Sequence, residues 1–403
     1  EIAQCLVGSE MCIRDRVMGR EKTLVFLRKY TMVIVLILVT LFFTWKTGGR
    51  MLLPQNVNNL IAQNAYVFIL ATGMLLCILT GGNIDLSVGS IVCFVGAIGA
   101  TFMVNKGFNV YVSIIIMLLA GLLIGAWQGF WIAYRRIPPF IVTLAGMLMF
   151  RGLSNIVLDG FTIAPLPDKY LELFNSYIID FFHGDGFNIT SLVVGIIVAC
   201  IFVVVTFKGR ISKIQKGYSV ASMGSDVGKC IVVSLVVVVF MWRLGQYKGI
   251  PNILIWIAVI VLIYWYITSK TVIGRHLYAI GGNEKAAQLS GINTNKVYFF
   301  AYANMGLLAA FAAMVTIARL NSANPTAGDG YEMDAIGSCF IGGASAYGGS
   351  GTIPGVIIGA TLMGVINLGM SIMGVDANWQ KVVKGAVLLA AVIFDVETKK
   401  NKS

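Results

Sequence analysis

Charged residues are scarce in this chain. Of its 403 residues, 12% are Asp, Glu, Lys or Arg, 58% are hydrophobic, and the mean hydropathy is +0.84. Soluble domains are about a quarter charged, so this composition excludes an ordinary soluble globular protein. The net charge of +12 would raise nucleic acid as a partner in a soluble chain. Here Lys and Arg lie mainly in short loops between apolar runs, and retention of basic loops in the cytoplasm explains that pattern. We therefore predict no nucleic-acid partner.

Residues that carry metal or nucleophile chemistry are few and scattered. His183 and His276 are the two His residues, and the 7 Cys residues show no CxxC spacing. Neither a metal site, a disulfide framework nor a catalytic triad is predicted. A phosphate-binding loop needs GxxxxGK followed by Ser or Thr, but the nearest string, GSDVGKC at 224–230, is one residue short and ends in Cys. We expect no bound cofactor and no enzyme activity in this chain.

Long apolar runs dominate the rest of the sequence. Many have about 17–25 residues, the length that a helix needs to cross roughly 30 Å of hydrocarbon. The pattern predicts an all-α, polytopic transmembrane bundle of about 10–12 spans. The predicted spans are 30–46, 58–80, 84–104, 108–134, 138–158, 187–207, 230–245, 250–268, 297–319, 335–347, 354–374 and 379–395.

The basic residues predict how these spans are oriented. Residues 1–17 look like a non-native, adapter-derived extension, and 18–29 form a short basic N-terminus. A transmembrane domain at 30–395 and a basic tail at 396–403 follow. Placing the basic loops inside puts both termini in the cytoplasm and the acidic loop 159–186 outside.

A short polar stretch, AIGGNEKAAQLSGI at 279–292, interrupts two apolar runs on the predicted cytoplasmic side. Asn283 is a good N-cap and Gly291 a good C-terminal stop, which predicts a helix of about two turns. So short a helix is marginal alone in water and needs a surface to pack on. It is either a connector packed on the membrane face or a docking segment in which Ala286 and Ala287 allow close approach.

Two ionisable residues lie within or beside apolar spans. Asp85, in GGNIDLSVGS, either caps a helix beginning at Leu86, with Asn83 or Ser87 assisting, or lines a path through the bundle. Arg151 lies roughly 20 Å along its helix, toward the outer side. It could snorkel, line the path or pair with an acid. A pair with Asp85 requires the preceding glycines to place that acid deep in the bilayer.

Two further segments combine glycine with polar residues. In 321–337, Asp334 is expected to cap the next span, and Asp329 and Glu332 are candidates for docking a partner. GGASAYGGSGTIPG at 342–355 is expected to permit close helix packing or a chain break buried in protein. The segments after the two glycine-rich stretches, 89–103 and 351–363, share a G…GATxM ending, which indicates either internal repetition or ordinary helix-contact composition.

Several motifs together resemble a known family. They are RHLYAIGGNEKAAQLSGI at 275–292, GGNIDLSVGS at 81–90, GAWQGFWIAYRRIPPFIVTLAGMLMFRG at 125–152 and DAIGSCFIGGASAYGGSGTIPGVIIGA at 334–360. The chain resembles permease subunits of bacterial binding-protein-dependent ABC sugar importers over residues 40–395. Within that family it looks most like xylose and multiple-monosaccharide permeases. The insertion in GGNIDLSVGS, commonly GGIDLSVGS, and the stretch 160–230 depart from the family pattern.

The resemblance implies a permease in the bacterial inner membrane that imports a monosaccharide such as xylose. Its partners would be a second permease copy, an extracytoplasmic sugar-binding protein, the lipid bilayer, and cytoplasmic ATPase subunits that use ATP and Mg²⁺. Permeases for autoinducers, nucleosides or branched-chain amino acids are the alternatives, and an ion-coupled secondary transporter is a more distant one.

The resemblance also divides the candidate residues into three groups. The ATPase-coupling residues would be Gly281, Gly282, Asn283, Glu284, Ala286, Ala287, Leu289, Ser290 and Gly291. Path residues would be Asn83, Asp85, Ser87, Arg151 and Asn304, and binding-protein docking residues would be Asp329 and Glu332.

Overall fold

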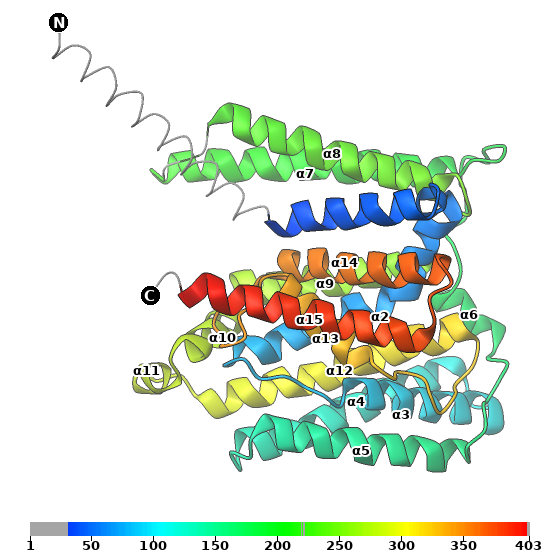
Figure 1. The fold of residues 1–403 in the computed structure, drawn as a ribbon, viewed down its shortest axis with the longest axis vertical. Helices are drawn as coiled ribbons and strands as arrows, with labels where there is room; N and C mark the ends of the chain where they lie inside the picture. The colour runs from blue at the N-terminus through cyan, green and yellow to red at the C-terminus, as the bar shows by residue number, and fades with distance from the viewer. Residues whose placement is uncertain (1–30, 219, 221, 401–403) are drawn as a thin grey trace, which may run out of the picture.

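The structure is a computed structural model that describes residues 31–218, 220 and 222–400. Helices with roughly parallel axes lie side by side in a bundle (Figure 1). Within the described residues, nine helices are long and apolar enough to cross a membrane. They are α2 (Pro54–Leu79), α3 with the π-helical η2 (Val88–Asn105), α4 (Val110–Ala133), α5 (Pro139–Leu158), α7 (Ile189–Gln215), α8 (Met223–Gly245), α9 (Asn252–Lys270), α12 (Thr294–Leu320) and α14 (Ile353–Ile372).

Two further helices run beside this set, the helix Thr31–Lys46 and α15 (Ala377–Lys400) (Figure 1). The nine candidate spans of the described residues confirm the polytopic helical bundle, against about 10–12 spans predicted from the sequence. The other described helices are short. They are η1 (Arg50–Leu52), α6 (Asp168–Phe174), α10 (Val272–Gly282), α11 (Glu284–Leu289) and α13 (Tyr331–Ile341).

Helix starts follow local signals that are visible in the sequence. Pro54 and Pro139 occupy the first helical turn of α2 and α5, where the missing amide hydrogen costs no hydrogen bond. The side chains of Asn188, Asn293 and Thr352 accept a hydrogen bond from the backbone three residues on, and so cap α7, α12 and α14. These local signals explain why most span positions were predicted well.

Some predicted boundaries were wrong. The span predicted at 335–347 is the short α13, which ends at Ile341 and is followed by irregular, glycine-rich chain. The span predicted from residue 84 begins at Val88, because residues 81–87 form a break between α2 and α3. Hydropathy cannot detect such breaks, since the broken backbone is buried in protein and carries few charges.

Helix also replaces chain that was predicted as loop or tail. α7 continues through the basic residues Lys208, Arg210 and Lys213, and α15 continues to Lys400 through most of the predicted tail. The string GSDVGKC at 224–230 lies inside α8, so its amides serve the helix rather than a phosphate loop. The predictions for residues 1–17 and 18–29, and for the tail beyond residue 400, lie outside the described residues.

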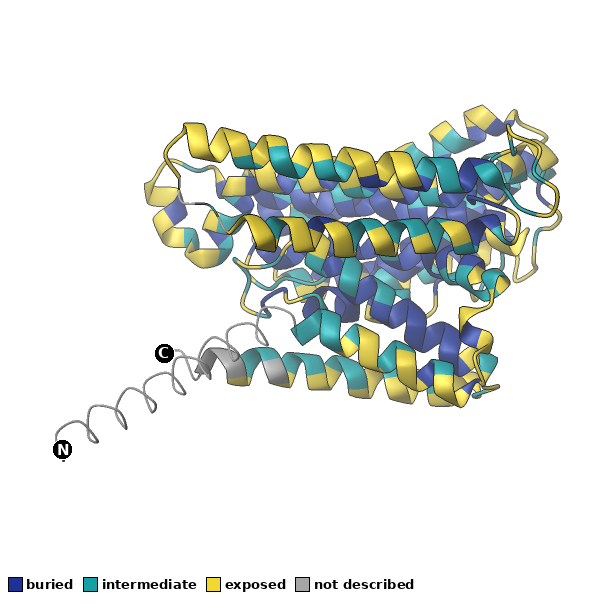
Figure 2. Cartoon of the chain, turned by 90° about the horizontal axis from the view of Figure 1, so that it is seen from above, coloured by how far each residue is buried: buried dark blue, intermediate teal, exposed yellow. Residues whose placement is uncertain are grey.

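α2 and α12 form the centre of the bundle, and most of their residues are buried (Figure 2). α12 packs closely against α4 because small residues meet there. A Cβ on Gly121 would overlap the carbonyl oxygen of Gly306 and the side chain of Ala310. α7 and α8 pair with each other at the edge and expose mostly apolar side chains. Such exposure suits contact with lipid tails, which are as apolar as the side chains.

The two ends of the bundle carry different segments. α10 and α11 lie at one end, and α6 lies at the opposite end (Figure 1). The chain beside α6 pairs with the segment after α12 through an antiparallel bridge between Ile163 and Ala323. The polar stretch 279–292 and the acidic loop 159–186 therefore lie at opposite ends, as predicted. We refer to these as the α11 end and the α6 end.

Candidate functional site

The predicted coupling segment forms a short, well-capped helix. α10 ends at Gly282, and Asn283 adopts an extended conformation from which its side-chain oxygen accepts the Ala286 amide at 3.0 Å. α11 spans Glu284–Leu289, and Gly291 follows with φ +85°. The N-cap and the C-terminal glycine predicted from the sequence are both confirmed. The caps satisfy backbone groups that so short a helix could not pair alone.

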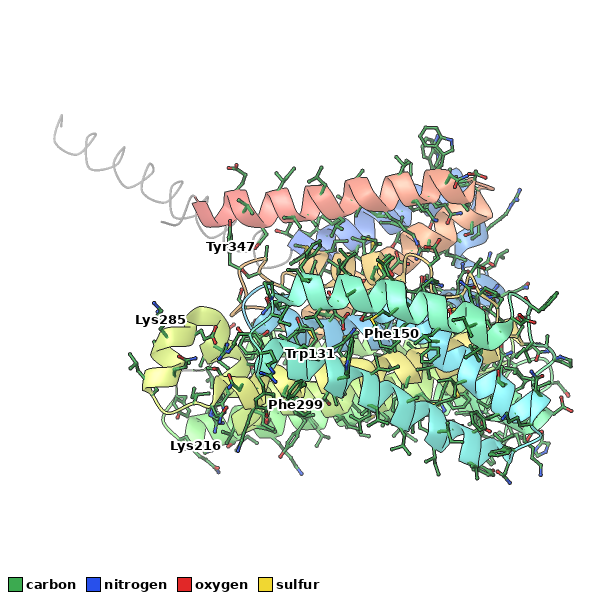
Figure 3. The ribbon with its side chains drawn as sticks, turned by 90° about the horizontal axis from the view of Figure 1, so that it is seen from below. Trp131, Phe150, Lys216, Lys285, Phe299 and Tyr347 are labelled. Carbon is green, nitrogen blue, oxygen red and sulfur yellow. The ribbon has the colours of Figure 1, made fainter. Side chains whose placement is uncertain are left out.

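α11 separates a buried side from an exposed one. Ala287 is 4% exposed and packs inside the chain, whereas Leu289 is 90% exposed. Ala286 is exposed as well, so the two alanines of the segment face different surroundings. In Figure 3, Lys285 lies at the α11 end, as do Lys216 and Tyr347. The exposed part of the candidate set consists of Gly282, Asn283, Ala286, Leu289, Ser290 and Gly291.

A polar network fastens the start of α11 to the bundle. Arg136, in the α4–α5 loop, places Nη1 2.6 Å from Glu284 Oε1. Its other terminal nitrogen, Nη2, donates to Thr294 Oγ1 at 2.8 Å and Asn295 Oδ1 at 2.6 Å, at the start of α12. The Tyr298 hydroxyl lies 3.2 Å from Glu284 Oε2. The sequence did not predict this role for Arg136, because its partner lies 148 positions away along the chain. As a basic loop residue, Arg136 indicated only which side of the membrane its loop occupies.

The break between α2 and α3 contains three of the predicted path residues. Asp85 is fully buried, and its Oδ1 accepts hydrogen bonds from the Ser87 amide at 2.8 Å and hydroxyl at 2.6 Å. Ser87 Oγ accepts in turn from Gln128 Nε2 of α4 at 2.7 Å. Asn83 donates to Thr80 O at 3.4 Å. The expected capping role of Asp85 is wrong: α3 begins at Val88, its N-cap is Ser87, and Asp85 binds that N-cap residue rather than an amide of the helix.

The hypothetical pair between Asp85 and Arg151 is wrong. Arg151 Nη1 donates to the carbonyl oxygens of Pro325 at 3.2 Å and Ala327 at 2.8 Å. These carbonyls belong to the segment after α12, which lies toward the α6 end, so Arg151 secures a connection there. The two side chains have different partners instead: Arg151 binds these carbonyls, and Asp85 binds Ser87.

Asn304 uses its polar atoms between helices. Its Oδ1 accepts from the Tyr264 hydroxyl of α9 at 2.8 Å, and its Nδ2 donates to Phe300 O at 2.8 Å. In this conformation the side chain of this predicted path residue joins α9 to α12.

The acidic residues near α13 have three different environments. Asp329 is exposed and lies 2.8 Å from Lys381 Nζ, and this hydrogen bond lowers the pKa of its carboxyl group. Glu332, a docking candidate, is only 7% exposed, so its side chain does not face a partner in this conformation. A Cβ on Gly89 of α3 would reach the Glu332 carboxylate, so Glu332 packs against that helix.

The expected capping role of Asp334 is wrong. The N-cap of α13 is Gly330, and Asp334 lies within the helix, where it is fully buried. Its Oδ2 accepts from the Tyr66 hydroxyl of α2 at 2.6 Å and from Lys384 Nζ of α15 at 2.9 Å. Asp334 therefore joins three helices. The sequence held no signal for this because both partners are distant along the chain.

Comparison with known proteins places the chain among permeases. Residues 56–392 match the family described as the permease component of a branched-chain amino acid transport system. The chain belongs to this permease family. The permease is 38% identical over 374 residues to the xylose transport system permease protein XylH of Escherichia coli K12, covering 93% of each chain.

Other relatives agree. The permease is 38% identical to XylH of Haemophilus influenzae, covering 93% of this chain and 97% of the relative. It is 33% identical to the ribose import permease protein RbsC of Escherichia coli K12, covering 85% of each chain. No solved structure matches the permease. These relatives confirm the resemblance to ABC sugar permeases and the location in the bacterial inner membrane. The permease is thus a transport component.

Proposed function

We propose that this permease is the membrane subunit of an ATP-driven importer that translocates a monosaccharide, xylose or a range of pentoses and hexoses. An extracytoplasmic binding protein delivers the sugar at the α6 end, and cytoplasmic ATPase subunits that use ATP and Mg²⁺ bind the α11 end. Two permease copies form the path. In this assignment both termini face the cytoplasm, since the described ends of the chain and α11 lie at the same end (Figure 1).

The observation that carries the ATPase contact is the exposure of Leu289 on a firmly held helix. Folding of the permease leaves this large apolar side chain 90% exposed, so its burial against a partner would contribute favourable free energy to binding. The caps of α11 and the Glu284–Arg136 pair hold the segment in place before docking. Such preorganisation lowers the entropy that binding must overcome.

The sugar assignment is supported by the xylose and ribose permeases to which the chain is related. The description of the matching family names branched-chain amino acids, which makes an amino-acid substrate the second candidate. Competition of xylose uptake by unlabelled ribose, glucose, galactose or leucine distinguishes these classes.

The docking assignment is tested with Ala286→Arg. The Ala286 side chain is exposed, so the substitution leaves the fold intact while placing bulk and charge in the proposed contact. The variant is expected to reach the membrane at wild-type levels, to lose its co-purifying ATPase in mild detergent, and to lose sugar uptake. A stably inserted variant that transports normally would rule out the docking assignment.

Tyr218→Arg is the matched control. Tyr218 lies between α7 and α8, next to residues at the α11 end, and is 66% exposed, so it receives the same charge outside the proposed contact. Normal ATPase recovery and uptake are expected for this variant. Equal loss in both variants would point to a general effect of added charge rather than to a contact at α11.

A further inference from the structure

The coupling segment touches both glycine-rich breaks of the chain. A Cβ on Gly281, at the end of α10, would overlap the carbonyl oxygen of Leu79 and the backbone of Gly349. The Gly349 amide donates to Leu79 O at 3.2 Å. The end of α2, the 342–351 break and the end of α10 therefore meet through backbone atoms.

The two breaks also contact each other. A Cβ on Gly82 would overlap the carbonyl oxygen of Ala346, and a Cβ on Gly348 would overlap the backbone of Gly81. We call residues 80–83, 281–282 and 346–351 the glycine joint. α3 begins just beyond its first segment and α14 just beyond its last. Because backbone atoms are already in contact, no flexible side chain separates these segments to absorb a displacement.

Hydrogen bonds also connect the segments of the glycine joint, so the segments resist separation as well as closer approach. The Tyr298 hydroxyl lies 2.9 Å from Thr80 O and 3.2 Å from Glu284 Oε2, so it connects the α2–α3 break with the start of α11. The Tyr278 hydroxyl of α10 donates to Gly351 O at 2.7 Å. Arg136 completes the set by binding Glu284 from the α4–α5 loop.

We propose that Gly281, Tyr298 and the Arg136–Glu284 pair are positioning residues that deliver movement of α11 to the starts of α3 and α14 through the glycine joint. The inference rests on the proposed function, since the ATPase must move α11. The inference specifies the place at which the movement of α11 reaches the membrane domain. That place is the two chain breaks together, rather than α9 or α12 alone. ATP hydrolysis and sugar movement are then coupled through residues outside α11, namely Gly281, Tyr298 and Arg136, the last two of which contact Glu284 at its start.

Gly281→Ala and Gly209→Ala form a matched pair. A Cβ on Gly281 overlaps two backbone segments, whereas one on Gly209, a helical glycine of α7 outside the coupling segment and the joint, meets no described atom within 4 Å. Each variant is reconstituted with the ATPase, and three quantities are measured: ATPase affinity, ATP hydrolysis, and sugar transported per ATP hydrolysed. For Gly281→Ala we expect wild-type affinity and retained hydrolysis, with transport per ATP reduced about fivefold or more. Gly209→Ala should match wild type in all three.

A second pair of variants tests the joint independently, in case Gly281→Ala does not fold. Tyr298→Phe removes only the hydroxyl group that lies in the joint. Tyr302→Phe, on the same face of α12, removes a buried hydroxyl that has no hydrogen-bond partner among the described residues. We expect loss of coupling only in Tyr298→Phe. We also expect that Glu284→Arg loses coupling and that Arg136→Glu restores part of it when the two are combined.

The outcomes separate the two claims. If wild-type permease binds no ATPase, the proposed function fails and this inference fails with it. If wild type binds ATPase and transports, but Gly281→Ala and Tyr298→Phe keep the wild-type ratio of sugar to ATP, the glycine joint is overturned while the proposed function stands.

Discussion

Leu289→Ala gives the most quantitative test of docking at α11. Leu289 is 90% exposed in the permease alone, so its truncation removes little packing from the folded chain. Alanine is also the best helix former, so α11 itself is not weakened. The effect should therefore appear only when the ATPase binds.

The expected magnitude follows from the carbon atoms removed. The loss of Cγ, Cδ1 and Cδ2 at about 0.8 kcal/mol per buried methylene-sized group comes to about 2.4 kcal/mol. At about 1.4 kcal/mol per tenfold change, ATPase affinity should fall about 50-fold. Light-scattering or interferometric titration of detergent-solubilised permease with purified ATPase gives both dissociation constants.

Ile214→Ala controls for the general effect of removing exposed apolar surface. Ile214 lies in the last turn of α7, close to Lys216 at the α11 end, and is 52% exposed (Figure 3). This variant should bind the ATPase as wild type does. If Leu289→Ala binds with unchanged affinity, the exposed face of α11 is not buried in the complex and the reasoning is refuted.

Two predictions concern the bundle itself and are measured by thermal unfolding in detergent. Lys384→Ala leaves the buried Asp334 carboxylate without its cation and should cost up to about 3 kcal/mol, whereas Lys381→Ala breaks the exposed pair with Asp329 and should cost less than about 1 kcal/mol. Equal shifts would contradict this difference in burial. Gly121→Ala should cost about 1–3 kcal/mol through overlap with α12, while Gly152→Ala, whose Cβ would have no atom of the described chain within 4 Å, should be neutral. A neutral Gly121→Ala would contradict the close α4–α12 packing.

The sequence predicted what depends on neighbouring residues. Apolar length identified the spans, and the N-cap of Asn283 and the left-handed Gly291 delimited α11, because these signals act within a few residues. The helix breaks were harder. Residues 81–87 and 342–351 are apolar enough to pass as helix, and only their glycines indicated a departure, without showing its direction.

The sequence could not predict contacts between distant segments. Glu284 contacts Arg136 across 148 positions, and Asp334 contacts Tyr66 across 268. The sequence contains several other possible partners for each acid and does not indicate which one lies nearby. The same lack of distance information produced the wrong Asp85–Arg151 pair. Asp334 also lies near the predicted start of a span, where acidic residues commonly cap helices. A capping role was therefore expected, whereas the structure shows contacts with distant helices.

ATP dependence of uptake tests the central claim most directly. Permease with its co-purified ATPase is sealed into vesicles, with ATP and Mg²⁺ on the α11 side and xylose-loaded binding protein on the α6 side. The account predicts sugar accumulation only when hydrolysable ATP, the ATPase and the binding protein are all present. Accumulation by the permease alone, driven by an ion gradient without ATP, would contradict it and identify an ion-coupled carrier.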